Sequence, residues 1–295
     1  MLGSVSSANF NLSRCFRDRY TTIVSNLVSH TVRLYQEAAR STVHSFTRGW
    51  ITIIAVIIFS GLMVLATMVS APLGLAGGFL LGAVNALLIG ATLSLIEQSV
   101  KGVRTLGIQD VLESFGQYFW DVIGVGFVLW VPLLLLDASM NANPYGGFFT
   151  AAVLLFLFIL LNPAPEVIYL TRQDSPLGVM RASYEFVVEN WIEWFLPFAL
   201  ILAPLGLSFF FSLSDRLGRG AGLDFFQVAI VPFTLLTAWL SYLGFPEEVS
   251  TVLVLMMTPP LAAAMLFFRG HLFGALSGST RRQRLFQGQS ERPDS

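Results

Sequence analysis

The sequence predicts an all-α protein, a polytopic bundle of membrane helices. Of its 295 residues, 55% are hydrophobic and only 12% are charged, whereas roughly 25% of the residues in an average soluble domain are charged. Several apolar runs reach the roughly 20 residues that a helix needs to cross about 30 Å of hydrocarbon. None alternates with the period of two typical of a barrel strand, so the predicted spanning elements are helices.

Residues 1–49 precede the first long apolar run and are predicted to form a cytoplasmic or interfacial amphipathic helix region. Between 17 and 46, apolar residues recur at three- and four-residue steps, whereas Arg33 and Arg40 lie elsewhere on the helical wheel. We expect this helix to lie on the membrane surface or against the bundle.

Residues 50–270 form the predicted transmembrane domain. Short polar stretches between its apolar segments carry basic residues such as Lys101 and Arg172, which favours the cytoplasmic side for those stretches. The apolar segments lie at about 50–70, 73–96, 119–137, 147–170, 192–213, 225–243 and 249–268. Four tryptophans fall at proposed membrane boundaries, where their rings prefer the headgroup layer: Trp50, Trp120, Trp191 and Trp194.

Two topologies fit these segments, six full crossings or seven. With the N-terminus in the cytoplasm, six crossings bring the polar, basic tail at 271–295 back inside and leave only Arg216 and Arg219 outside, as the positive-inside rule favours. We therefore predict an inner-membrane protein with both termini in the cytoplasm, and 225–243 re-entrant or buried. Seven crossings, with 225–243 spanning, are the alternative. The composition of the tail predicts disorder.

An internal repeat relates residues of about 91–132 to residues of about 160–201 at an offset of 69. The offset aligns Glu97 with Glu166, and it also aligns Ser114 with Ser183, Phe115 with Tyr184, and Asp121 with Asn190. Each copy would be a helix ending at a glutamate, a cytoplasmic amphipathic helix, and a second helix entering the membrane. A third, partial copy, MMTPPLAAAMLFFR at 256–269, resembles LLNPAPEVIYLTR at 160–172 in its prolines and final arginine but lacks the glutamate.

The repeat makes Glu97 and Glu166 the candidate polar or gating residues, because it places them at equivalent helix ends near the membrane boundary. Two such carboxylates could form a gate, a proton-responsive pair or a cation site. Alternatively, Glu97 pairs with Lys101 four residues later and both carboxylates face headgroups. Asn85 and Asn162 are further polar candidates, since an amide in an apolar segment needs a hydrogen-bond partner.

Prolines and glycines predict local backbone features. Pro163 and Pro165 lack the helical N–H and disturb the preceding turn, so we expect a helix hinge there, with a counterpart at Pro259 and Pro260. Small residues every four positions let another helix approach closely, within the chain, in a homo-oligomer or on a partner membrane protein. The predicted packing residues are Gly74, Gly78, Gly82 and Gly90.

Enzyme signatures are absent from the sequence. The three histidines lie far apart without a metal-binding motif around them, and there is no nucleophile elbow, phosphate loop or dinucleotide fingerprint. We therefore predict no catalytic residues, no metal site and no cofactor. The net charge of -1 gives no electrostatic reason to expect nucleic acid as a partner, which leaves the lipid bilayer and other membrane proteins.

The repeated unit, in which a helix is followed by IYLTR at 168–172, RASYEFVVENWI at 181–192 and another helix, resembles bacterial six-helix integral membrane families of unknown function. These are similar to the membrane domain attached to some glycerophosphodiester phosphodiesterases. The resemblance covers residues 50–270 and includes no phosphodiesterase catalytic domain. Because the sequence shows no enzyme signature, we interpret the protein as a non-enzymatic scaffold, assembly or envelope-maintenance component. The alternative is a transporter or channel for a small solute or lipid, with its path between the two pseudo-repeats.

Overall fold

The computed structural model describes residues 29, 31–102, 105–140, 145–218, 237, 240–241 and 243–278. All regular structure in these residues is helical, which confirms the all-α class. Residues 1–28, nearly all of 225–243 and the tail from 279 lie outside the described residues. The choice between six and seven crossings therefore stays a prediction.

The first two long helices form a hairpin. Helix α2 (Trp50–Ser70) is followed by the short 3₁₀ helix η1 (Ala71–Leu73) and by α3 (Gly74–Lys101), which packs along α2. The turn depends on glycine, because Gly74 has a φ of +57° and a Cβ on Gly77 would lie 2.0 Å from the Ser70 carbonyl oxygen. The hairpin buries a small apolar cluster: Ala55, Phe59, Leu88, Ala91, Leu95 and Leu106.

The remaining helices include the two segments that the predicted repeat relates. Helix α3 ends at Lys101, and Gly102 caps it in the left-handed backbone conformation. It is followed by α4 (Ile108–Glu113) and α5 (Phe119–Met140). In the second copy α6 (Gly146–Leu160), α7 (Ala164–Glu166) and the π-helix η2 (Val167–Thr171) lead into α8 (Pro176–Gly218). The last helix is α10 (Glu247–Ser277).

The two copies have matching local features. Ser114 and Ser183 are both fully buried, and each hydroxyl donates to a backbone carbonyl one turn earlier, Val111 in the first case and Val179 in the second. They differ at the join to the next helix. In the first copy a turn separates α4 from α5, whereas in the second a single non-helical residue, Asn190 with φ -126°, breaks α8.

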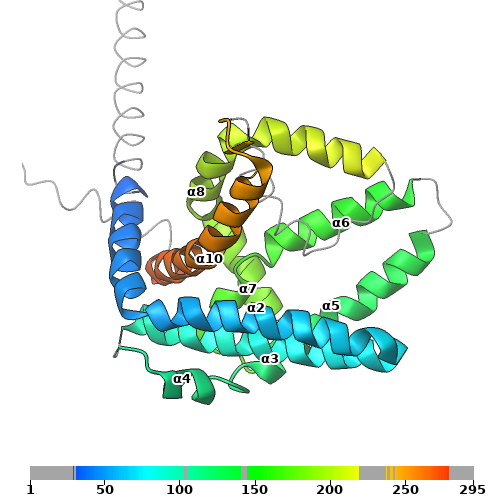
Figure 1. Ribbon diagram of the computed structural model, residues 1–295, viewed down its shortest axis with the longest axis horizontal. Helices are drawn as coiled ribbons and strands as arrows, with labels where there is room; N and C mark the ends of the chain where they lie inside the picture. Colours follow the sequence, from blue (N-terminus) through cyan, green and yellow to red (C-terminus); the bar gives the residue numbers. More distant parts are fainter. Residues whose placement is uncertain are drawn as a thin grey trace, which may run out of the picture.

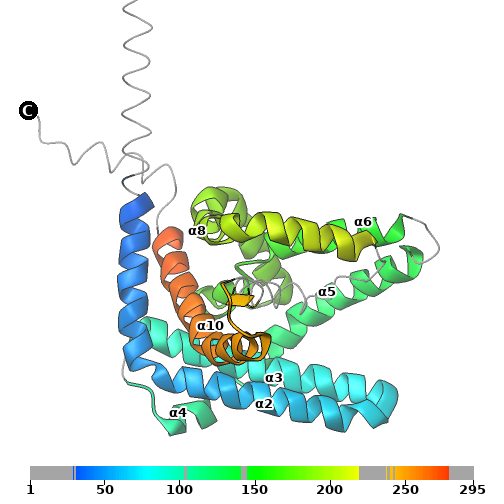
Figure 2. The ribbon, with the colours of Figure 1, turned by 45° about the horizontal axis from the view of Figure 1, so that its top comes forward.

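The helix ends gather at two opposite ends of the molecule. The α2–α3 turn and the facing ends of α5 and α6 lie together on the right in both views, whereas α4 and the N-terminal helix (residues 31–48) lie on the left (Figures 1 and 2). Lys101 and Arg172, from the two polar stretches predicted to be cytoplasmic, lie together, because both bind Glu97.

Three helices in the described part of the chain are long and apolar enough to cross a membrane, or four if a bent pair counts as one span. They are Trp50–Lys101, which contains both α2 and α3, Phe119–Met140 and Glu247–Ser277. The bent pair is α6 with the segment Ala164–Thr171, at an angle of 40°. Large apolar side chains on these helices are exposed, for example Ile58, Leu135 and Met256, as membrane localisation requires.

The main apolar core lies where α3, α7, η2, α8 and α10 meet. The N-terminal helix packs on this core through Leu34 and Ala38, so the part of the predicted amphipathic helix within 31–48 lies against the bundle. Helix α10 continues beyond the predicted tail boundary at 271, because Leu272 and Phe273 are buried in the same core. The tail thus begins after Ser277.

Three of the four boundary tryptophans are exposed, as expected for the headgroup layer. Trp50, Trp120 and Trp191 have more than half of their surface accessible, whereas Trp194 is 0% exposed. The prediction for Trp194 is wrong because its ring packs in the core against Phe186 and Phe273.

Candidate functional site

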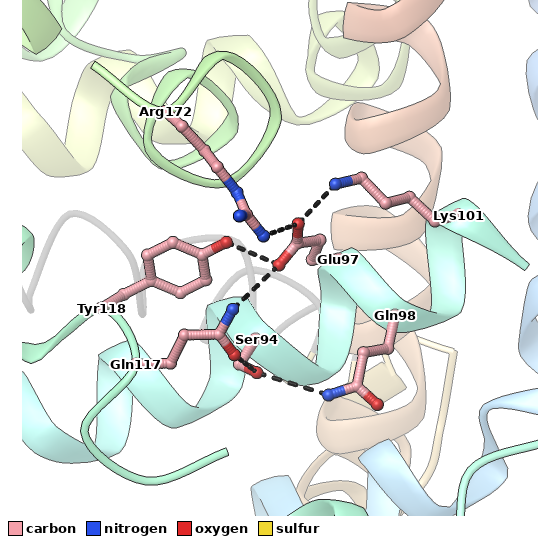
Figure 3. Close-up of polar contacts among 7 residues, drawn as sticks. All are labelled: Ser94, Glu97, Gln98, Lys101, Gln117, Tyr118 and Arg172. Atoms are coloured by element: carbon pink, nitrogen blue, oxygen red, sulfur yellow. Dashed lines mark hydrogen bonds and ion pairs between the residues drawn. The ribbon is translucent and has the colours of Figure 1, made fainter. Parts of the chain in front are cut away.

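Glu97, near the end of α3, accepts four hydrogen bonds (Figure 3). Its Oε1 is 2.5 Å from Lys101 Nζ and 2.9 Å from Arg172 Nη2. Its Oε2 accepts from the Tyr118 hydroxyl at 2.5 Å and from Gln117 Nε2 at 3.4 Å. The predicted pairing with Lys101 is therefore present, and the carboxylate also joins α3 to the start of the second copy.

A second set of polar groups fixes the Glu97 cluster in place. Ser94 donates to Gln117 Oε1 at 2.6 Å and lies 3.5 Å from Gln98 Nε2. Burial, and then the hydrogen bond to Glu97, raise the pKa of Tyr118, so this hydroxyl stays protonated and donates at neutral pH. The hydrogen bond to Glu97 likewise raises the pKa of the Arg172 guanidinium.

Arg172 is held in a backbone conformation that is uncommon for a residue with a side chain. Its φ is +48°, and it is the only non-glycine residue with positive φ in the described part of the chain. It directly follows the π-helix η2. Residues in such conformations cost free energy, and π-helical turns are frequent at functional sites. Here the conformation turns the chain out of η2 and brings the guanidinium to Glu97.

Glu166 lies deeper in the molecule and has one charged partner. Arg269 Nε is 2.7 Å from Oε1 and Arg269 Nη2 is 2.8 Å from Oε2, a bidentate pair between α7 and α10. The Glu166 side chain is 1% exposed and the Arg269 side chain is 14% exposed. Arg269 Nη2 also donates to the Asn162 carbonyl oxygen at 2.5 Å. That carbonyl belongs to the turn between α6 and α7, in which prolines leave backbone acceptors without helical donors.

Aromatic rings enclose the Glu166–Arg269 pair. The guanidinium carbon lies 5.2 Å from the Trp194 ring centre and 6.0 Å from the Phe198 ring centre, and Trp194 Nε1 donates to Asn162 Oδ1 at 2.9 Å. The two ring centres are themselves only 6.3 Å apart, so both rings lie on one side of the guanidinium and stabilise its charge where water has little access. Asn162, a predicted polar candidate, thus binds this cluster through both its side chain and its backbone carbonyl.

Tyr169 lies in η2 between the two carboxylates. Its hydroxyl is buried and has no hydrogen-bond partner among the described residues, and it is within electrostatic range of Glu166, Arg269 and Glu97. A Cβ on Gly270 would lie only 2.7 Å from this hydroxyl. The close approach of α10 to η2 at this point therefore requires glycine.

The structure separates the other predicted residues. Asn85 in α3 is half-buried, and its side chain makes no hydrogen bond with another described residue. Pro163 and Pro165 lie where α6, α7 and η2 change direction, as a hinge requires, but Pro259 and Pro260 lie inside the continuous helix α10. The predicted hinge at Pro259 and Pro260 is therefore wrong, because the helix is not broken there.

The glycine stripe on α3 divides into a packed and an open part. A Cβ on Gly90 would lie 3.1 Å from the backbone of Tyr118 and of Phe119, so this position is in close helix contact within the chain. Positions 74, 78 and 82 have open space there. Close packing within the described chain thus uses Gly90 and not Gly74, Gly78 or Gly82.

The partners of the two carboxylates were only partly recognisable in the sequence. Arg172 and Arg269 stand out as the final arginines of the proline-containing segments, but nothing in the sequence indicates that each binds the glutamate of the preceding copy. Tyr118, Gln117 and Trp194 carry no sequence signal for their contacts. No group of three or more His, Cys, Asp or Glu side chains that could hold a metal is found among the described residues. Comparisons with protein-family models, curated proteins and solved structures find no match.

Proposed function

We propose that the chain is a non-enzymatic integral protein of the inner membrane that acts as a scaffold, assembly or envelope-maintenance component, in line with the resemblance of its repeated unit to six-helix membrane families. One observation carries the proposal. Both candidate carboxylates are paired with arginines from distant parts of the chain, so these charged groups bind one another and join the helices that carry them.

The same observation supports the proposed orientation. Lys101 and Arg172 meet at Glu97 near the end of α3, and the N-terminal helix contacts Ser99 in the same part of α3. Basic residues favour the cytoplasmic face. A reporter fused after Ser295 tests the topology. A cytoplasmic signal agrees with six crossings and a cytoplasmic C-terminus, whereas a signal on the opposite face contradicts both.

Transport is the second candidate, favoured by the Tyr169 hydroxyl, which is buried without a hydrogen-bond partner among the described residues and within electrostatic range of both Glu97 and Glu166. Buried ionisable groups between repeats are typical of transport pathways. In that case the ion pairs would be the closed form of a gate.

Two variants separate the candidates. For a scaffold, Glu97→Gln with Glu166→Gln lowers the amount of folded protein, and Tyr169→Phe leaves it unchanged, because the removed hydroxyl has no partner. For a transporter, Tyr169→Phe changes a measurable flux in proteoliposomes at unchanged folded amount. A scaffold also retains a partner in fixed stoichiometry when native membranes are solubilised gently. Absence of such a partner, together with a flux that Tyr169→Phe alters, overturns the scaffold proposal.

A further inference from the structure

The exposed face of the N-terminal helix is basic. Arg33, Arg40, His44 and Arg48 are all exposed, and steps of seven, four and four residues place them within about 80° of one another around the helix. Glu37 is the one acidic residue on this face. None of the three arginines forms an ion pair or a hydrogen bond through its side chain with another described residue.

The opposite face of this helix is fixed to the bundle. The Ser45 hydroxyl donates to the Ser99 carbonyl oxygen at 3.0 Å and lies 2.8 Å from His271 Nε2. The Tyr35 hydroxyl donates to the Glu193 carbonyl oxygen at 2.8 Å. The helix is thus held on α3, α10 and α8 and cannot turn its basic face inward.

A single residue, Gly49, connects this helix to α2. A Cβ there would lie 2.7 Å from Ser99 Oγ and 2.9 Å from the Ser45 carbonyl oxygen, so the corner is tight. Both ribbon views show the helix running crosswise to α2 (Figures 1 and 2). Because α2 is a candidate span that begins at the exposed Trp50, the crosswise helix lies at the level where a membrane has its headgroups.

We infer that this basic face binds the phosphate groups of anionic lipids in the membrane that the chain spans. Its charges match those of such lipids, and cations near an anionic membrane surface are attracted within a Debye length. Exposed Val32 and Val43 flank the arginines, which suits the apolar boundary below the headgroups better than an acidic protein surface. The face extends from Arg33 to Arg48, about 22 Å at the rise of an α-helix.

The inference is tested by titrating phosphatidylglycerol, and separately phosphatidylcholine, into the full chain in a neutral detergent, with bound lipid counted by native mass spectrometry. We expect tighter binding of phosphatidylglycerol, weakened by salt. In the variant R33Q/R40Q/R48Q its apparent Kd should rise about fivefold per arginine removed, while that for phosphatidylcholine stays the same.

Three further variants control the measurement. R33K/R40K/R48K keeps the charges and should bind phosphatidylglycerol nearly as the wild type does. Glu37→Gln removes a negative charge from the same face and should tighten binding. Arg181→Gln removes an exposed arginine that already pairs with Glu185 at 2.8 Å and should have little effect. An unchanged affinity in R33Q/R40Q/R48Q, or no preference for phosphatidylglycerol in the wild type, as for a face that binds an acidic protein, overturns the inference.

Discussion

Arg269 binds both carboxylate oxygens of Glu166, at 2.7 and 2.8 Å, and so joins the predicted third, partial copy of the proline-containing segment to the predicted second copy. Arg172, at the same place in the second copy, binds Glu97 of the first. Each arginine thus pairs with the glutamate of the preceding copy. The third copy has Ala263 where a glutamate would be expected, and no fourth arginine is needed to neutralise it.

The buried pair predicts a strong dependence on both partners. Glu166→Gln should lower the free energy of unfolding by about 3–5 kcal/mol, because it leaves the guanidinium of Arg269 buried without a counter-charge. Arg269→Met should cost a similar amount. Thermal unfolding of the purified protein in detergent measures both.

The double variant Glu166→Leu with Arg269→Met supplies the control. Replacing a buried ion pair by apolar residues is often neutral, so the double variant should regain most of the stability that either single variant loses. If losses from the two single changes simply add, the two side chains act separately and the pair does not hold α10 to α7.

Glu97→Gln is the matched substitution in the first copy, and its effect should be smaller. The partners Lys101 and Arg172 are 45% and 62% exposed, so water can solvate them once the carboxylate is neutralised. We expect a loss of about 1 kcal/mol, as for exposed pairs, in the same unfolding assay. A loss equal to that of Glu166→Gln would contradict this ranking.

The sequence predicted the parts of this cluster better than their pairing. The offset of 69 residues places Glu97 and Glu166 at equivalent helix ends, and composition alone indicates membrane helices. The contacts between copies depend instead on how α10 packs against α7, and no local sequence pattern predicts that packing. Trp194 shows the same limit. Nothing in the sequence distinguishes it from Trp191 three residues earlier, yet Trp191 is exposed and Trp194 is buried in the core.

Alkaline pH should loosen the N-terminal helix through Tyr35. Burial, and then the negative charge of Glu193, raise the pKa of Tyr35 from 10.0 to about 12. A raised pKa means that the folded state keeps the proton longer than the unfolded state, so this contribution to stability is complete below pH 10.0 and is lost as pH rises towards about 12.

The measurement compares the wild type with Tyr35→Phe in thermal unfolding across that pH window. The variant should be less stable by about 1 kcal/mol near neutral pH, because the hydrogen bond to the Glu193 carbonyl is lost. The difference between the two proteins should shrink as pH rises. A constant difference would show that Tyr35 does not titrate differently on folding.

The glycines of α3 give a matched pair of substitutions. Gly90→Val should destabilise the protein by about 1–3 kcal/mol, the usual cost of overpacking, because even a Cβ there comes 3.1 Å from the backbone at Tyr118 and Phe119. Gly82→Val carries the same change in helix propensity two turns earlier, where a Cβ meets nothing within 4 Å, and should be tolerated. Thermal unfolding in detergent compares the two. If Gly82→Val instead destabilises the protein only when it is an oligomer, as chemical crosslinking in membranes would show, the open part of the stripe packs against a second chain.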